Sequence, residues 1–289
     1  MSGGHPIACN ACGSSDARHL FTTRGYHLVR CRACALAFIA NPPCDAELER
    51  IYATGGDYHA PLRDPASLEA RDMARVAAEH LSFVRRHVTA GTLLDVGCST
   101  GAFLGAARDA GFAVEGVEFS PASAAFARAR YDVPVAQGDV RAAGAGPYDL
   151  VTMFDVIEHV RDPTADLREV ARRVRSGGLL VASTPDIDGW FPRASLKLAA
   201  RLDHWPHGEA PYHLYQFSRA TFADALRRAG FEPVGWKSTN MPLAYSFGSA
   251  ETLRGSPRML AYAALFAPLA KIAPWFGGGD WFYVAARKI

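Results

Sequence analysis

Four cysteines near the start of this 289-residue chain have the residue type and spacing of a metal site. They form two C-x2-C pairs with eighteen residues between them, and they are Cys9, Cys12, Cys31 and Cys34. Each C-x2-C turn directs two thiolates at one ion, so two such turns complete the tetrahedral sulfur site that Zn²⁺ prefers. Two disulfides are the alternative, and a reducing compartment disfavours them. The spacing therefore predicts a structural zinc module.

Glycines and acidic residues form a second chemical pattern, at the ends of predicted strands. The apolar segment 92–96 leads into the turn 97–101, Gly-Cys-Ser-Thr-Gly, and a helix follows. Glycines there let the backbone approach a ligand, and the helix N-terminus directs amides at it. The turn does not match the G-x-G-x-x-G dinucleotide fingerprint. Carboxylates that can accept hydrogen bonds from a ribose or an amine stand at three successive strand ends. They are Asp95, Glu118 and Asp139.

Strands and helices must alternate to position these residues. The predicted strands of this part of the chain are 92–96, 113–119, 133–136, 148–154 and 179–183, and helical segments separate them. Helices between strands imply a parallel sheet that is covered on both faces. Such an open α/β sheet binds ligands at the carboxyl ends of its strands. The glycines and carboxylates fall at that edge.

These motifs resemble class I S-adenosylmethionine-dependent methyltransferases. The matching runs are 93–101, 116–120 and 138–140, and the runs 154–160, 213–218 and 229–231 are similar to the ubiquinone-type O-methyltransferase subgroup. The resemblance covers roughly residues 67–240 and a last strand, and it implies a Rossmann-like sheet of seven strands. Ser99 departs from the family, which usually has a second glycine at that position.

The resemblance implies S-adenosylmethionine as cofactor and assigns roles to matching residues. The cofactor-binding set so implied is Asp95, Gly97, Cys98, Gly101, Glu118, Phe119, Asp139, Val140 and Asp155. In the family pattern, Asp95 and the turn after it would face the methionine part, and Glu118 would hold both ribose hydroxyls. Phe119 and Val140 would lie against the adenine, and Asp139 would accept from its amino group.

Histidines are the candidates for the reaction itself. A sulfonium already activates the methyl group, so the protein has mainly to align a nucleophile behind it. A hydroxyl acceptor benefits from a general base, and histidine suits that role near neutral pH. His159, just past the fourth strand, is the first candidate and His213 the second. The run Asp155-x-x-Glu158-His159 also has the form of a magnesium site, and we favour a structural or general-base role over a metal.

The patterns divide the chain into three predicted parts. Residues 1–43 form the zinc-binding module, residues 44–90 a linker and an N-terminal helix, and residues 91–289 the methyltransferase domain. Two insertions are expected in that domain, at 186–216 and 241–280. The first carries aromatic residues and histidines near the end of the fifth strand, where aromatic side chains would line an acceptor pocket.

The second insertion is apolar and separates the predicted sixth and seventh strands, 231–239 and 281–286, which are a close pair in the family. From residue 241 onward, five Lys and Arg stand against two acidic residues. Residues 255–276 fit a helix in a membrane interface, a lid over an apolar acceptor, or a helix packed on the core or a partner subunit.

Composition limits the function classes. The net charge of +2 argues against a polybasic nucleic-acid binder. The sequence has no run of about 18 uncharged apolar residues, so we do not expect a membrane-spanning helix. Residues 1–6 have no signal-peptide character, so we expect a cytoplasmic protein, with peripheral contact at the inner face of the membrane as an alternative.

The leading hypothesis is methyl transfer, at oxygen, to a small-molecule, glycan or lipid-linked acceptor. An RNA methyltransferase whose zinc module grips RNA is the first alternative. Residues 1–40 hold four arginines and one acidic residue, which is little for extensive phosphate binding. A non-catalytic protein that binds S-adenosylmethionine and zinc is the second alternative. The acceptor and the oligomeric state are not predicted.

Overall fold

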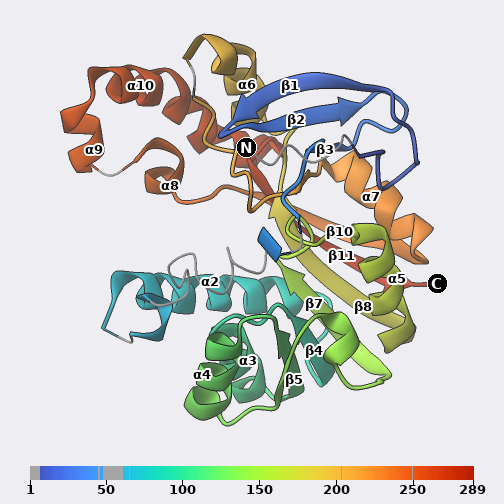
Figure 1. The fold of residues 1–289 in the computed structure, drawn as a ribbon. Coiled ribbons are helices and arrows are strands. Elements are labelled where there is room, and N and C mark those ends of the chain that lie inside the picture. Colours follow the sequence, from blue (N-terminus) through green and yellow to red (C-terminus); the bar gives the residue numbers. More distant parts are fainter. Residues whose placement is uncertain (1–6, 45, 48–60, 65, 203, 249) are drawn as a thin grey trace.

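The computed structural model describes residues 1–289 except 1–6, 45, 48–60, 65, 203 and 249 (Figure 1). Much of the predicted linker therefore lies outside the described residues. Within the described part of the chain, the strands form one seven-stranded sheet and one four-stranded sheet. The larger sheet carries the predicted ligand edge, and the smaller one belongs mainly to the N-terminal module.

The seven-stranded sheet has the strand order β10-β11-β8-β7-β4-β5-β6. Its strands are β4 (Gly91–Val96), β5 (Phe112–Glu118), β6 (Val135–Gln137), β7 (Tyr148–Phe154), β8 (Val174–Pro185), β10 (Phe231–Thr239) and β11 (Trp281–Lys288). The α/β fold and the pairing of the last two strands are confirmed. The five strands predicted to form a parallel sheet, β4 to β8, do pair in parallel, whereas β11 is antiparallel to both β10 and β8. The described helices between β10 and β11 do not carry the chain back across the sheet, so β11 begins at the end of the sheet where β10 finishes.

Helices cover both faces of this sheet. They are α2 (Leu68–Val84), α3 (Ala102–Asp109), α4 (Pro121–Tyr131), α5 (Pro163–Arg173) and α7 (Arg219–Arg228), with short 3-10 turns η1 (Pro61–Arg63) and η2 (Val140–Ala142). The core on one face includes residues of α2, α3 and α4, and the core on the other includes residues of α5 and α7. Polar side chains start several helices: Ser120 accepts from the Ser123 amide, and Asp162 accepts from the Ala165 amide. These caps fix where each helix leaves the ligand edge.

The four-stranded sheet joins the N-terminal module to the rest of the chain. Its order is β1 (Ala17–Thr23), β2 (Tyr26–Cys31), β3 (Ala37–Ile39) and β9 (Tyr215–Gln216). Strand β9 comes from the segment predicted as the first insertion, and it pairs antiparallel with β3. The Ile39 amide donates to the Leu214 carbonyl at 2.9 Å and continues this contact.

A helical lobe stands at one side of the molecule, on the upper left in Figure 1. This α10 lobe consists of α6 (Trp190–Leu202), α8 (Leu243–Phe247), α9 (Ala250–Gly255), α10 (Pro257–Ile272) and η3 (Ala273–Phe276). It has an apolar core of its own, in which Phe191 of α6 contacts Phe247 and Phe266. The two predicted insertions thus pack on each other.

Candidate functional site

The turn after β4 needs glycine at two positions for steric reasons. Gly97 and Gly101 both lie in the left-handed region, with φ of 74° and 82°. A Cβ on Gly97 would lie 2.5 Å from Val156 Cγ2, and one on Gly101 would lie 2.8 Å from Ala127 Cβ. Ser99 is also left-handed, with φ of 51°, although it replaces the family's glycine. The turn is therefore packed closely against Val156, which follows β7, and against Ala127 of α4.

Glu118 ties this turn to the end of β5. Its carboxylate accepts from the Ser99 amide at 2.9 Å and from the Ser120 amide at 2.8 Å. The side chain is buried and lies at the carboxyl edge of the sheet. This is the place where a ribose-binding acid was predicted, and a carboxylate has further lone pairs for hydroxyl donors.

Asp95 is a buried carboxyl group one strand away. Its Oδ1 accepts from the Thr152 hydroxyl at 2.6 Å. The pKa of Asp95 is raised to about 7. Burial is the main cause and nearby Glu118 adds to it, while the Thr152 hydrogen bond opposes the rise. A cationic ligand beside Asp95 would restore its negative charge, which fits the predicted place for the methionine part of the cofactor.

The remaining predicted adenine-side residues differ in exposure. The Phe119 ring is 54% exposed and Val140 is buried. Asp139 accepts from the Arg141 amide at 2.8 Å and pairs with the Arg141 guanidinium at 3.0 Å, so its carboxylate already has partners. The side chain of Cys98 belongs to the hydrophobic core, where a Cβ on Gly116 would lie 2.9 Å from its sulfur. The Cys98 thiol is thereby confined to packing.

Asp155 connects the end of β7 to the last strand. Its Oδ1 accepts from the Ser183 hydroxyl and from the indole Nε1 of Trp281, each at 2.6 Å. Asp155 itself has a left-handed φ of 55°. Burial raises the pKa of Asp155, and these two donors oppose that shift. The carboxylate therefore faces Ser183 and Trp281, and the cluster of possible metal ligands found among the described residues contains Glu158, His159 and His213 without Asp155.

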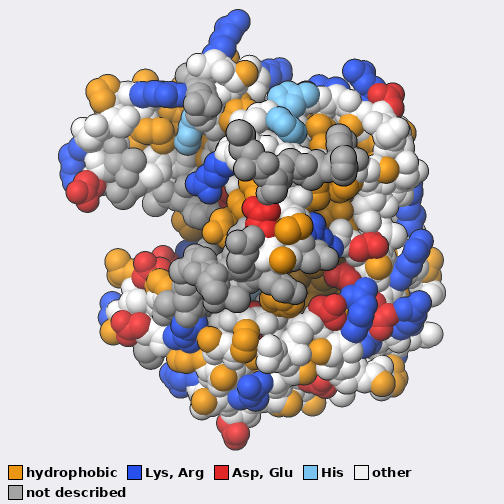
Figure 2. All heavy atoms as spheres, viewed as in Figure 1, with side chains coloured by type: hydrophobic (Ala, Val, Ile, Leu, Met, Phe, Trp, Pro, Cys, Tyr) orange, Lys and Arg blue, Asp and Glu red, His pale blue; other side chains and the backbone are white. Residues whose placement is uncertain are grey.

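A cavity with about 650 Å³ of empty space opens beside Asp155. It lies between α2 and the ends of β10 and β11, on the side where Figure 2 shows the molecule hollowed below the α10 lobe. The lining residues are Arg75, Val76, Glu79, His80, Asp155, Thr239, Asn240, Met241, Pro242, Trp281 and Tyr283. Aromatic walls with a few polar groups at a sheet's carboxyl edge are typical of small-molecule sites.

Asp155 is the one member of this lining that was predicted as a site residue, and three of the other members, Trp281, Tyr283 and His80, are aromatic. Trp281 and Tyr283 start the last strand with period-two spacing, the sequence signal that places them on the same face. His80 lies in the apolar stripe of α2 and stacks on Phe154 with the ring centres 3.9 Å apart. Burial lowers the pKa of His80 to about 3, and Lys237 adds to the effect, so its ring is neutral.

The two predicted catalytic histidines lie together. The rings of His159 and His213 are 4.6 Å apart between centres. His159 Nδ1 lies 3.0 Å from the Tyr212 carbonyl, and since a carbonyl only accepts, Nδ1 carries the proton and Nε2 is the basic nitrogen. His213 Nε2 lies 3.3 Å from Glu209, and burial lowers the pKa of His213 to about 4. Of the pair, His159 is half-buried, whereas His213 is buried.

Glu158 completes this cluster. Its Oε2 accepts from the Thr184 hydroxyl at 2.9 Å, while Oε1 has no hydrogen-bond partner among the described residues. Burial raises the pKa of Glu158 well above its usual range, and Asp155 adds to this. Ligand atoms of Glu158, His159 and His213 lie within 4.8 Å of one another. Tertiary contact thus supplies His213 where the sequence motif suggested Asp155.

The four cysteines converge as their spacing predicts. Their sulfur atoms lie within 4.8 Å of one another, with Cys9 and Cys34 3.4 Å apart and Cys12 and Cys31 3.6 Å apart. None of them is in a disulfide. These separations match the edges of a tetrahedron of sulfurs about 2.3 Å from a zinc ion. The donor set therefore fits Zn²⁺.

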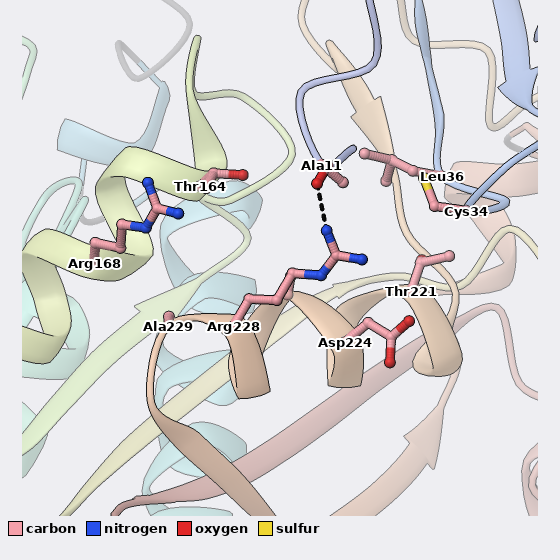
Figure 3. Close-up of a pocket in the computed structure, with 10 residues that line it drawn as sticks. Ala11, Cys34, Leu36, Thr164, Arg168, Thr221, Asp224, Arg228 and Ala229 are labelled. Carbon is pink, nitrogen blue, oxygen red and sulfur yellow. Dashed lines mark hydrogen bonds between the residues drawn. The ribbon is translucent and has the colours of Figure 1, made fainter. Parts of the chain in front are cut away.

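The module docks on α5 and α7 through this knuckle. Asn10 donates to Asp162 at 2.9 Å and accepts from the Thr164 hydroxyl at 2.7 Å. The Arg228 guanidinium donates to the Ala11 carbonyl, as Figure 3 shows. The hollow drawn there, with about 410 Å³ of empty space, includes Cys34 and Arg168 in its lining but none of the strand-end residues. It is a seam between the two units, away from the ligand edge.

A family model described as a methyltransferase domain matches residues 69–235. The chain belongs to the methyltransferase-domain family. It is a class I S-adenosylmethionine-dependent methyltransferase, so the predicted enzyme class and methyl donor are confirmed.

Relatives of this methyltransferase act on different atoms. It is 28% identical over 205 residues to a ubiquinone biosynthesis O-methyltransferase of Bordetella avium, which covers 66% of this chain and 82% of that protein. It is 34% identical over 155 residues to a dTDP-4-amino-2,3,4,6-tetradeoxy-D-glucose N,N-dimethyltransferase of Saccharopolyspora spinosa, covering 51% and 59%. The match to a further curated relative spans only 40% of that protein.

Solved structures agree on the fold. The methyltransferase is similar to magnesium protoporphyrin IX methyltransferase from Synechocystis PCC 6803 with bound SAH, with a TM-score of 0.57 at 14% identity. That likeness covers 85% of this chain and 100% of the other. At this identity it supports the Rossmann-like arrangement alone.

Proposed function

We propose that this methyltransferase transfers a methyl group to an oxygen of a small-molecule, glycan or lipid-linked acceptor, with His159 as general base. The observation that carries the proposal is that one loop, at one edge of the sheet, holds both a residue of the cavity lining and a candidate base. The loop after β7 holds Asp155, which lines the cavity, and His159, whose basic nitrogen is Nε2.

The cavity supports a small and partly apolar acceptor. Trp281 and Tyr283 offer aromatic surface, and Asp155 offers a polar contact beside them. The matched relatives include both an O- and an N-methyltransferase. We favour oxygen because a hydroxyl, unlike a neutral amine, gains from a nearby base.

In this proposal, different residues bind the cofactor and accept the proton. Asp95 and Glu118 would hold the cofactor, which supplies a methyl group on a positively charged sulfonium when bound. His159 Nε2 receives the proton that the acceptor oxygen loses. The Tyr212 carbonyl fixes the His159 tautomer, and His213 packs edge-on against the ring and keeps it in place.

Zinc at the four thiolates is part of the same proposal. The closely spaced sulfurs support it, and so does the position of the knuckle against α5. A metal there would stabilise the module, whose small sheet buries little apolar surface by itself.

The test begins with the acceptor class. Purified protein and methyl-labelled S-adenosylmethionine are incubated separately with lipid, RNA and small polar fractions of a cell extract. We expect label in the lipid or the small polar fraction. Label in RNA that nuclease removes would contradict the proposal and support the RNA methyltransferase alternative, in which the module grips RNA.

The role of His159 as base is tested by measuring methyl transfer by the His159→Gln variant to the fraction that the wild-type protein labels. We expect kcat to fall by about a hundredfold or more, with unchanged affinity for S-adenosylmethionine measured by calorimetry. His27→Gln, at an exposed position of β2, is the matched control. If magnesium restored activity after chelation to a zinc-loaded protein, a metal at Glu158, His159 and His213 would replace the base mechanism.

A further inference from the structure

Helix α10 is apolar on both of its faces. Its inner face, made of Tyr262, Ala263, Phe266 and Ala270, packs into the core of the α10 lobe. The opposite face is exposed and continues into η3. This α10 face consists of Leu260, Ala261, Ala264, Leu265, Pro268, Ile272, Trp275 and Phe276. Trp275 is 82% exposed and Leu265 60% exposed. A contiguous apolar surface of this kind marks an interaction site.

The charged residues on α10 itself are positive, and the preceding helix α9 carries exposed Glu251 and Arg254. Arg258 lies in the first turn of α10 and Lys271 in the last, both exposed, and residues 257–276 contain no acidic residue. Exposed cations continue on the adjoining helix α6, and they are Arg193, Lys197 and Arg201. Figure 2 shows basic and apolar side chains together on this lobe. The partner of the face should therefore be apolar within and negatively charged at its surface.

We propose that the α10 face lies in the surface of an anionic lipid bilayer, with the helix parallel to the membrane plane. The leucines and Ile272 would enter the acyl boundary, and Trp275 would sit at headgroup level, where indoles concentrate. Arg258 and Lys271 have long apolar stems, so their charged ends can reach anionic headgroups from the ends of the face.

The ends of the segment favour lying on the membrane over crossing it. By length and composition alone, Pro257–Phe276 could span a bilayer. However, the chain returns to the sheet directly after η3. The Gly278 carbonyl accepts from the Trp190 amide at 2.8 Å, and the Gly279 amide donates to the Ser238 hydroxyl at 2.9 Å. Crossing would break these contacts and expose the buried face with Tyr262.

The same charges disfavour a second copy of this chain as the occupant. A two-fold pairing of the α10 face would bring the Arg258 and Lys271 ends of two helices together in antiparallel packing. The segment has no acidic residue to pair with them. Like charges would therefore meet at the rim of the contact, whereas an anionic lipid surface neutralises them.

Vesicle binding tests the proposal without any acceptor, so its outcome is independent of the proposed function. The full-length protein is sedimented with vesicles of phosphatidylglycerol and phosphatidylcholine, and with vesicles of phosphatidylcholine alone. We expect binding to the anionic vesicles that weakens at high salt. Arg258→Gln and Lys271→Gln should each lower the partition coefficient about fivefold. Arg86→Gln, an exposed arginine on the segment after α2, is the matched control.

Two further variants address the apolar contact. Leu265→Ser should weaken binding, whereas Leu68→Ser, an exposed leucine at the start of α2, should not. Vesicles should shift tryptophan emission to the blue in the wild type, and Trp275→Phe should abolish the shift. Thermal unfolding checks that each variant is folded.

The proposal is overturned if the wild-type protein does not bind anionic vesicles. It is also overturned if the Leu265→Ser variant binds these vesicles as strongly as the Leu68→Ser variant does. It is equally overturned if sedimentation velocity shows a dimer that Leu265→Ser dissociates, since the face would then be a subunit interface.

Discussion

Buried carboxyl groups at the sheet edge are arranged for a cationic ligand. Asp95 and Glu118 end neighbouring strands, and Glu118 is already held by the Ser99 and Ser120 amides. Asp95 accepts the Thr152 hydrogen bond at its Oδ1, and its pKa is raised to about 7, chiefly by burial. A positive group on the cofactor would thus lie near Glu118, whose carboxylate is held in place, and near Asp95, which would lose its proton when the cofactor binds.

Cofactor affinity should therefore depend on pH through Asp95. A raised pKa means that the ligand-free protein holds this proton below about pH 7, and a cation binds the ionised form better. We expect S-adenosylmethionine affinity, measured by calorimetry, to rise with pH up to about 7 and then level off. Asp95→Asn should weaken binding and flatten the profile; a profile that Asp95→Asn leaves unchanged would assign the pH dependence to another group.

For the stability of the ligand-free protein, the raised pKa of Asp95 predicts the opposite pH dependence. The pKa of Asp95 is about 7 in the folded protein and 3.8 is its ordinary value, so ionisation of this group disfavours the fold. The protein therefore loses stability as the pH rises from the ordinary pKa through the folded-state pKa. Asp95→Asn removes that penalty and should raise the Tm of the ligand-free protein above pH 7. A lower Tm at that pH would mean that the charge is stabilised by contacts beyond Thr152.

At the scale of elements, the turn between β4 and α3 is set by close packing. Gly97 has both a left-handed φ and no room for a Cβ, because Val156 Cγ2 lies 2.5 Å from that position. Val156 follows β7, so this contact brings the turn and the loop that carries His159 against each other. Cofactor and acceptor groups are thereby held on two touching loops.

Gly97→Ala should displace both loops. We expect a loss of about 1–3 kcal/mol in stability and at least a tenfold weaker affinity for S-adenosylmethionine. Gly111→Ala is the matched control, because its φ is 98° but nothing lies within 4 Å of its Cβ position. Equal effects on affinity would show that backbone strain, and not contact with Val156, is responsible.

At the scale of the whole molecule, the N-terminal module and the predicted catalytic histidines are mechanically joined. Strand β3 follows the second cysteine pair and binds β9, and the amides of Leu214 and Tyr215 donate to the Glu158 carbonyl at 2.8 and 3.1 Å. Those residues follow His213 directly. Order in the knuckle is thus transmitted through two short strands to the cluster of Glu158, His159 and His213.

Metal removal should therefore affect the acceptor side more than the cofactor side. After treatment with a strong chelator, or in Cys12→Ser, we expect a lower Tm and a lower kcat, with little change in S-adenosylmethionine affinity. Zinc, and not magnesium, should restore the chelated protein. Metal analysis that finds no zinc in the native protein, or an equal loss of cofactor affinity, would contradict this.

The sequence by itself determined the features that depend on neighbours along the chain. The segment Tyr148–Phe154 is predicted to the residue, the cysteine pairs converge, and the acidic strand ends lie where alternating strands and helices place them. Periodicity, turn glycines and helix caps are local signals, so they require no knowledge of distant contacts.

Only the tertiary structure decided which distant residues meet. The Asp155 carboxylate turns to Trp281, 126 residues away, and leaves the motif that the sequence suggested. His213 joins His159 because β9 is held by the N-terminal sheet, and β11 runs antiparallel because the α10 lobe returns the chain to the same sheet end. These outcomes depend on the packing of insertions, whose amphipathic patterns indicate a buried face but not the surface that covers it.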